Sequence, residues 1–344
     1  MRACVIFNPA AKGQKAERFR RCLDAIAAEC ALRRTTAPGD ARALAAEAIR
    51  AGFETIFAAG GDGTLNEVLN GFADAPDGFS RARLGLLPLG TVNVFARELG
   101  IPLQPDAAWQ LLRCAGERRI DLPCVEHGGA HERKRHYFAQ MAGAGLDARA
   151  IELVSWSHKK RIGPLAYVVA GLKALAEKPA RITIRVERRA SGVEGANDAG
   201  PRPSALDSRL GEGQMILIGN GRLYGGSFRV FPGADACDGL LDVCIFPRAN
   251  WLTLIRCALP LLLGKRLPEG AVRRFRSESF ALLSESPAPF EIDGELAGHL
   301  PATFSVKRAG LRVLVPGKVT GDRKFNETGA QFMSRATCHL PLVT

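Results

Sequence analysis

The stretch FAAGGDGTLNEVLNGF, residues 57–72, places three glycines around a single aspartate, Asp62. The apolar run TIFAAGG (55–61) is typical of a buried strand, and the residues after the glycines have helical spacing. Glycine has no Cβ, so backbone N–H groups at the end of the strand can approach a ligand closely, and the partial positive charge of a helix N-terminus favours phosphate. The stretch therefore predicts a phosphate-binding turn between a strand and a helix.

Asp62 decides how this turn is interpreted. A tight turn alone accounts for the glycines, but it does not account for an acid where anionic phosphates bind. An acid is useful there if a metal ion lies between it and the phosphates, or if it accepts a proton. Thr64 and Glu67 also form a T-x-x-E capping box, so both residues have the alternative role of starting the helix. The turn is not a Walker A loop, because GxxxxGK[ST] occurs nowhere in the chain.

The first third of the chain alternates strand-like and helix-like segments. The strand-like segments are 3–8, 55–61 and 84–90, with a shorter one at 32–36. The helix-like segments are 14–33, 40–52 with Asp40 as N-cap and Gly52 as its end, and 106–116. This alternation predicts a mostly parallel sheet covered on both faces, with ligands beyond the carboxyl ends of the strands, where the glycine turn lies.

After about residue 120 the pattern changes to frequent short strands. Two helix-like segments interrupt them, near 163–178 and 250–264. The pattern predicts a second domain rich in antiparallel strands. Residues 190–212 are rich in Gly, Pro, Ser and Asp and predict a mobile loop, and residues 331–344 predict a loose tail.

Composition and charge limit the expected partners. The length of 344 residues suits two domains, and the formal net charge of +12 favours nucleic acid, phosphate ligands or an acidic membrane. No helix-turn-helix or RNA-binding signature occurs, so we expect no nucleic-acid partner. The nine cysteines are scattered and never in CxxC spacing, which argues against disulfides and a zinc site and favours a reducing cytoplasm.

Two features bear on membranes. The N-terminus lacks the pattern of a signal peptide, and no apolar stretch approaches the roughly 20 residues that span a bilayer. The segment WLTLIRCALPLLLGKR (251–266) is interpreted as a core helix with a proline kink, in preference to a membrane-surface helix.

The segment GAGLDA (143–148) matches the dinucleotide fingerprint G-x-G-x-x-A. It lies in the strand-rich half, and no acidic residue follows about 20 positions later to bind a ribose. The match is therefore weak support for an oxidoreductase.

The segment GGDGTLNEVLNG resembles the signature of the diacylglycerol kinase catalytic-domain family, which includes bacterial soluble lipid kinases and sphingosine kinases. Other motifs occur in the family's order over roughly residues 3–316: NPAAKG (8–13), TTAPGDA (35–41), LPLGTVNVFARELGIP (87–102), IDL (120–122), GAGLDA, IGPLAYVVAGLKAL (162–175), GNGRLYGGSFRVFPGADACDGLLDV (219–243) and EIDGE (291–295). NAD kinases share GGDGT, but the continuation LNEVLNG and the DG and DGE elements favour lipid kinases.

The resemblance implies a two-domain fold of the NAD kinase and diacylglycerol kinase type. A Rossmann-like α/β domain with a mostly parallel sheet would comprise residues 1–122, with about 311–330 returning to it through LRVLVP. An antiparallel β-sandwich domain would comprise residues 123–310. The implied activity is Mg²⁺-dependent transfer of the ATP γ-phosphate to the hydroxyl of a lipid, such as diacylglycerol or a sphingoid or ceramide-like lipid, between the two domains.

The resemblance also implies roles for individual residues. Glu295 would accept the proton of the lipid hydroxyl, with Asp293 beside it, and Asp62 would act near the phosphates through Mg²⁺ and water. The nucleotide would be contacted by Asn8, Thr36, Gly60, Gly61, Asp62, Gly63, Thr64, Leu65, Asn66 and Thr91. A second, structural Mg²⁺ would be held by Asp235, Asp238 and the backbone carbonyl of Leu240. Plain turns remain the alternative for Asp238-Gly239 and Asp293-Gly294.

The sequence departs from the family pattern in two places. Val94 follows Asn93 where many relatives have an acid of the Mg²⁺ network, although Asp62 and Asp121 are present. Lys12 and Gly13 are exchanged relative to the commonest first motif. Val94 keeps a non-catalytic nucleotide- or lipid-binding regulator as an alternative, and an NAD kinase-like enzyme stays one because NAD kinases share GGDGT. For a lipid kinase, we expect a cytoplasmic protein at the inner face of the membrane, with a homodimer as a weaker expectation.

Overall fold

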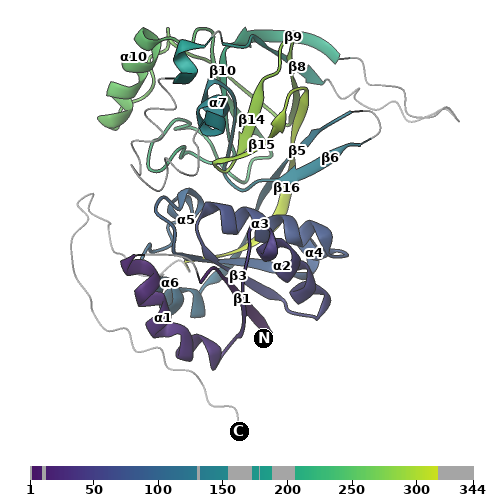
Figure 1. The fold of residues 1–344 in the computed structure, drawn as a ribbon, viewed down its shortest axis with the longest axis vertical. Helices are drawn as coiled ribbons and strands as arrows, with labels where there is room; N and C mark the ends of the chain where they lie inside the picture. The colour runs from purple at the N-terminus through teal and green to yellow at the C-terminus, as the bar shows by residue number, and fades with distance from the viewer. Residues whose placement is uncertain are drawn as a thin grey trace, which may run out of the picture.

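The structure, a computed structural model, describes residues 2–9, 13–129, 132–153, 173–177, 179–187 and 206–316. Figure 1 shows two lobes stacked along the long axis of the molecule, with the N-terminal third of the chain in the lower lobe. Two long strands, β5 (Gly116–His127) and β16 (Ala302–Val315), run between the lobes.

The lower lobe is built around a parallel sheet. Its strands lie in the order β2-β1-β3-β4, and they are β1 (Ala3–Phe7), β2 (Ala31–Arg34), β3 (Thr55–Gly60) and β4 (Arg83–Pro88). All three strand pairs are parallel, and every residue of β3 is buried, as expected for a sheet covered on both faces. The helices are α1 (Gln14–Ala27), α2 (Asp40–Arg50), α3 (Asp62–Asp74), α4 (Gly78–Arg81), α5 (Val94–Glu98) and α6 (Pro105–Arg113). This lobe confirms the predicted α/β class.

Two local expectations in this lobe are wrong. The segment predicted as one helix over 14–33 ends at Ala27, and residues 31–34 form β2 by pairing with β1, in agreement with the short strand predicted at 32–36. Asp40 does not cap α2, because the N-cap is Gly39, whose φ of 91° suits glycine. The Asp40 carboxylate instead accepts hydrogen bonds from the backbone N–H groups of Thr36 (2.7 Å) and Ala37 (2.9 Å) and so closes the preceding turn.

Strand β16 joins the two lobes into one sheet. Near its end Val313 pairs in parallel with Leu84 of β4, and along most of its length the strand pairs antiparallel with β5. The register shifts between Lys307 and Leu311, where Ala309 has a φ of 51°. Both long strands therefore continue through the predicted boundaries at 122 and 310.

The upper lobe is an antiparallel sandwich, as predicted. One layer continues the first sheet through β13 (Ser279–Ser284), β8 (Ile182–Glu187) and β9 (Leu206–Gly213), and β6 (Lys134–Tyr137) pairs with β5. The other layer has the order β12-β11-β10-β7-β14-β15. Its strands are β7 (Met141–Gly145), β10 (Met215–Gly219), β11 (Leu241–Phe246), β12 (Arg273–Ser277), β14 (Pro289–Ile292) and β15 (Glu295–His299). Phe280, Phe290 and Phe304 pack between the layers.

The remaining predicted segments have mixed outcomes. Residues 206–212, predicted as part of a loop, lie in β9 because they pair with β8, and residues 190–205 lie outside the described residues. The expected tail at 331–344 and most of the helix-like segment 163–178 also lie outside them.

The upper lobe contains α7 (Leu146–Leu153) and α10 (Trp251–Leu262), and the described residues 173–176 are also helical. The expectation of a core helix at 251–266 is wrong, because α10 lies at the outer end of the lobe with much of its apolar surface exposed (Figure 1). None of the helices in the described ranges is long and apolar enough to cross a membrane.

Candidate active site

The turn after β3 is shaped by close backbone packing. A Cβ on Gly90, in the loop after β4, would lie 2.5 Å from the Cα of Gly61, and a Cβ on Gly60 would lie 2.4 Å from the side chain of Thr64. Only glycine allows the two loops to touch backbone to backbone. Helix α3 then begins at Asp62 with Gly61 as its N-cap. Gly61 has no side chain to cap the helix, so an anion is the natural partner for the N–H groups of the first turn.

Glu67 has a different role from the predicted capping box. Its carboxylate accepts hydrogen bonds from the backbone N–H groups of Gly39 (2.9 Å) and Ala41 (3.0 Å). These groups belong to the start of α2, so Glu67 caps the neighbouring helix and fixes α2 against α3. The capping-box alternative for Thr64 and Glu67 is therefore wrong.

Asp62 lies between the turn and the start of α5. Its Oδ1 accepts a hydrogen bond from the backbone N–H of Val94 (2.9 Å). Burial, and then the nearby charge of Asp293, raise the pKa of Asp62 to about 6. The carboxylate is thus held in a place that is short of positive charge.

Asp293 is the centre of the DGE turn between β14 and β15. Asp293 and Gly294 have φ angles of 48° and 87° and connect two antiparallel strands. The segment is therefore a hairpin turn, as the alternative interpretation of Asp293-Gly294 predicts. The buried Asp293 carboxylate accepts hydrogen bonds from three backbone N–H groups and one amide: Ala139 (2.8 Å), Gln140 (3.0 Å), Met141 (3.2 Å) and the Nδ2 of Asn66 (3.0 Å). Asn66 belongs to α3, so Asp293 joins the DGE turn of the upper lobe to helix α3 of the lower lobe.

Glu295 follows this turn and reaches the glycine turn of the lower lobe. A Cβ on Gly63 would lie only 2.1 Å from Oε1 of Glu295. The Glu295 side chain is exposed, in contrast to the buried Asp293. The structure therefore brings together the three predicted acids Asp62, Asp293 and Glu295, and only Glu295 is exposed next to the turn.

A cavity of about 1000 Å³ lies beside these groups and is lined by both lobes. The predicted nucleotide residues on its wall are Asn8, Thr36, Gly61, Gly63 and Thr64, together with Glu295. Gly60, Asp62 and Leu65 lie behind the turn, around a small hollow next to Asn93. Asn66 is engaged with Asp293, and Thr91 is exposed on the loop after Gly90 and does not line the cavity.

Sequence reasoning missed two basic residues near the cavity. Arg34, at the carboxyl end of β2, lines it. Lys15, in the first turn of α1, donates a hydrogen bond to the carbonyl of Gly90 (2.9 Å). Each follows directly from the α/β pattern, because one ends a parallel strand and the other starts a helix at the same edge of the sheet.

A buried polar cluster in the upper lobe lies next to the DGE turn and supports it. The hydroxyl of Tyr224 lies 2.6 Å from Oδ2 of Asp147 and 2.8 Å from Oε1 of Glu291, and the other oxygen of Glu291 accepts a hydrogen bond from Gly294 N–H (2.7 Å). Burial raises the pKa of both carboxyls. A Cβ on Gly143 would lie within 2.9 Å of all three side chains, which explains the glycine. GAGLDA is thus a structural segment of the sandwich.

The acids fit a catalytic Mg²⁺ in part. A buried carboxylate with a raised pKa is stabilised by a divalent cation, which applies to Asp62. No cluster of three or more His, Cys, Asp or Glu side chains is arranged to hold a metal within the described ranges. An ion bound here would therefore take its remaining ligands from phosphate oxygens and water, as Mg²⁺ commonly does.

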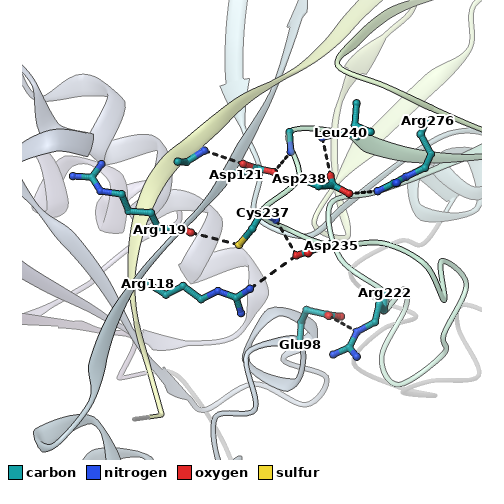
Figure 2. A network of polar contacts seen from close by, with 12 residues as sticks. Glu98, Arg118, Arg119, Asp121, Arg222, Asp235, Cys237, Asp238, Leu240 and Arg276 are labelled. Carbon is teal, nitrogen blue, oxygen red and sulfur yellow. Dashed lines mark hydrogen bonds and ion pairs between the residues drawn. The ribbon is translucent and has the colours of Figure 1, made fainter. Parts of the chain in front are cut away.

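The predicted structural-metal residues have other partners. Figure 2 shows Arg276 of β12 directed at Asp238, with which it forms an ion pair, while its Nε lies 3.0 Å from Oδ2 of Asp242. Asp238 also accepts a hydrogen bond from Leu240 N–H (3.0 Å), and Asp235 accepts one from Cys237 N–H (3.1 Å). A guanidinium therefore neutralises the acid at which the cation was expected, and a metal held by Asp235, Asp238 and the Leu240 carbonyl stays a prediction.

Comparisons with known proteins agree with this geometry. Residues 2–125 match the diacylglycerol kinase catalytic domain, and residues 140–315 match the YegS C-terminal NAD kinase beta sandwich-like domain. The chain belongs to the diacylglycerol kinase catalytic-domain family. It is a kinase.

Individual relatives cover most of the chain. A probable lipid kinase YegS-like of Pseudomonas aeruginosa is 37% identical over 84% of this chain and 85% of its own length. The diacylglycerol kinase of Bacillus subtilis is 28% identical over 92% of this chain and 96% of its own length. A crystal structure of a putative diacylglycerol kinase from Bacillus anthracis covers 91% of this chain and 97% of its own with a TM-score of 0.68 at 20% identity, which shows that this family member has the same fold.

Proposed function

We propose that this kinase transfers the γ-phosphate of ATP to the hydroxyl of a membrane lipid, of the diacylglycerol or the sphingoid and ceramide-like class. The observation that carries the proposal is the contact of Glu295, from the upper lobe, with Gly63 of the glycine turn. An exposed carboxylate of one lobe thereby lies next to the proposed phosphate-binding turn of the other, and both line the same cavity.

The glycine turn is the proposed phosphate site. The N-terminus of α3 and its glycines would bind the β- and γ-phosphates, and Asn8, Thr36 and Thr64 on the cavity wall would contact the nucleotide. Thr91 would act only through the position of its loop, and Leu65 only through its packing in α3. Bound Mg²⁺ neutralises charge on the transferred phosphoryl group, and Asp62 is the carboxylate proposed to bind it.

Glu295 is the proposed general base. Its carboxylate takes the proton of the lipid hydroxyl as the hydroxyl oxygen forms a bond to the γ-phosphorus, and the bond from that phosphorus to the bridging oxygen of ADP breaks. Asp293 is proposed as a positioning residue, because four hydrogen bonds hold its carboxylate inside the lobe. It fixes the turn from which Glu295 projects.

The acceptor determines where the protein works. A lipid with long acyl chains stays in a bilayer, so we propose a cytoplasmic enzyme that associates peripherally with the inner face of the membrane. NAD phosphorylation would need no membrane and serves as the competing outcome.

The test is lipid labelling with radioactive ATP, Mg²⁺ and vesicles that carry diacylglycerol, ceramide or sphingosine. We expect one lipid to be labelled by the wild type and not by Glu295→Gln or Asp62→Asn. Glu269→Gln changes an exposed glutamate of the same lobe and should retain activity. Labelling of NAD without labelling of any lipid would reject the proposal, as would normal lipid labelling by Glu295→Gln.

A further inference from the structure

Helix α10 carries a continuous exposed apolar face. Its members are large side chains that are between 52% and 69% exposed, namely Trp251, Leu252, Ile255, Leu259, Leu262 and Leu263 just beyond the helix end. At 100° per residue these positions fall within an arc of about 120° on one side of the helix. We call these six residues the α10 face.

The opposite side of α10 fixes the helix to the sandwich. Cys257 is buried in an apolar cluster with Cys244 and Phe246, and Leu254 and Leu261 pack against that cluster. The Asn250 side chain caps the helix by accepting a hydrogen bond from Thr253 N–H (2.9 Å). The helix is therefore firmly placed and still presents the α10 face outward, at the end of the upper lobe far from the lower one (Figure 1).

The surroundings of the α10 face are basic. Arg248, Arg256, Lys265 and Arg266 are exposed around it, and no acidic residue occurs in the sequence from 247 to 268. Arg248 and Arg256 also line a hollow of about 280 Å³ with Leu252 at its edge. An apolar face bordered by cations matches an interface with an anionic bilayer, where apolar side chains enter the acyl region and cations meet phosphate headgroups.

We propose that α10 is the membrane-docking element of this protein, lying flat in the interface of an anionic lipid bilayer with the α10 face toward the acyl chains. Arg248 and Arg256 bind lipid phosphates at the N-terminal end of the helix. The inference rests on the proposed function and deepens it, because it specifies which element holds an enzyme with a lipid acceptor at the membrane. A second copy of the chain fits the face less well, since the basic residues around it would then lie opposite one another.

Vesicle co-sedimentation tests the proposal without nucleotide. We expect the wild type to bind vesicles of phosphatidylcholine with phosphatidylglycerol, and to bind pure phosphatidylcholine much more weakly. Leu259→Ser should lower binding several-fold and Ile255→Ser/Leu259→Ser at least tenfold. Leu210→Ser is the matched control, because Leu210 is also exposed (45%) but lies on β9, and it should bind like the wild type. Equal binding by the double variant and the wild type would overturn the proposal.

Charge and depth are tested separately. Arg248→Gln/Arg256→Gln should reduce binding to the anionic vesicles and leave the weak binding to phosphatidylcholine unchanged. Lipids with brominated acyl chains should quench the tryptophan fluorescence of the vesicle-bound wild type more than that of Trp251→Phe, because Trp251 lies on the α10 face. Sedimentation velocity tests the competing occupant: a dimer that Ile255→Ser/Leu259→Ser abolishes, together with unchanged vesicle binding, would assign the face to a second copy and reject the proposal.

Activity separates this inference from the proposed function. Ile255→Ser/Leu259→Ser should phosphorylate a short-chain diacylglycerol in solution at the wild-type rate and lose activity on vesicles. If the wild type phosphorylates no lipid in either form, the proposed function fails, whereas the co-sedimentation result still decides the role of α10.

Discussion

Glu295 lies directly against Gly63, although the two residues belong to different lobes and are separated by most of the chain. A Cβ at position 63 would overlap Oε1 of Glu295 at 2.1 Å, so the glycine is what allows the carboxylate to rest on the first turn of α3. The contact sets the distance between the proposed base and the phosphate-binding turn.

Gly63→Ala should therefore displace Glu295. We expect turnover to fall about 100-fold, because misplacing a reactive group by about 1 Å costs that much. Stability should change by less than about 1 kcal/mol, since alanine favours the helix that it joins. Steady-state kinetics and urea unfolding measure the two effects. Gly116→Ala, where a Cβ would contact nothing within 4 Å, is the control. Wild-type turnover in Gly63→Ala would show that the contact does not position the base.

Asp62→Asn should stabilise the protein while abolishing transfer. The pKa of Asp62 is raised to about 6 in the folded protein, so its ionisation disfavours the folded state as the pH rises from its ordinary value near 4 through 6. Asparagine keeps the acceptor for Val94 N–H and removes the charge. We expect a gain in the free energy of unfolding of about 2 kcal/mol at pH 7.5, and less than half of that at pH 4.5.

Urea unfolding at the two pH values, without Mg²⁺ or nucleotide, tests this expectation. A gain that is the same at both values would show that the Asp62 carboxylate does not titrate in this range, and a loss of stability at pH 7.5 would show that a donor already compensates its charge.

The sequence was sufficient to predict the α/β lobe and the sandwich, because both follow from short-range patterns. The buried run before Gly60 and the alternation of strands with helices specify a parallel sheet, and the frequent strands later in the chain specify an antiparallel one. The helical spacing of 14–33 overlaps the short strand predicted at 32–36, and pairing with β1 makes residues 31–34 a strand.

The roles of single polar residues were harder to predict, because they depend on contacts between distant segments. Glu67 fits a capping box in sequence but caps α2, and Asp293 resembles a catalytic acid but is held by Asn66 and three backbone amides. The segment 251–264 is predominantly apolar, with Arg256 as its one charged residue, and its sequence is interpreted as a core helix. Only its position at the end of the lobe shows which side is exposed.

Tyr224→Phe should destabilise the support of the DGE turn. The hydroxyl of Tyr224 lies within hydrogen-bond distance of both Asp147 and Glu291, whose pKa values burial raises. It has one proton to donate, so without it the two buried carboxyls lose the donor that they share. We expect a loss of about 2–4 kcal/mol in the free energy of unfolding at pH 7.5. The loss should be smaller at pH 5, because both acids are more fully protonated there and can bond to each other's oxygens.

Urea unfolding at pH 5 and 7.5 measures this effect, and Asp147→Asn in the Tyr224→Phe background provides the control. Removing one of the two acids should recover part of the stability at pH 7.5. A loss of the same size at both pH values would indicate that the hydroxyl contributes by packing alone.

Arg276→Met should reveal whether a guanidinium replaces a cation at Asp238. The ion pair of Arg276 with Asp238 ties β12 to the loop that approaches Asp121, and its ion pair with Asp242 lies between β12 and β11. The Asp121 carboxylate accepts a hydrogen bond from Gly239 N–H at 2.6 Å. Removing the guanidinium leaves two neighbouring acids without their partner, so the free energy of unfolding should fall by about 1 kcal/mol.

Thermal unfolding with Mg²⁺ and with EDTA, in the absence of nucleotide, separates the two accounts of this loop. If Arg276 takes the place of the cation, the Tm of the wild type is the same in both buffers, and Mg²⁺ recovers part of the stability lost in Arg276→Met because Asp238 is then free to bind it. Arg273→Met, an exposed substitution on the same strand, should match the wild type. A wild-type Tm that rises with Mg²⁺ and is unaffected by Arg276→Met would instead support a metal held by Asp235, Asp238 and Leu240, since the ion would then provide the stability here assigned to the arginine.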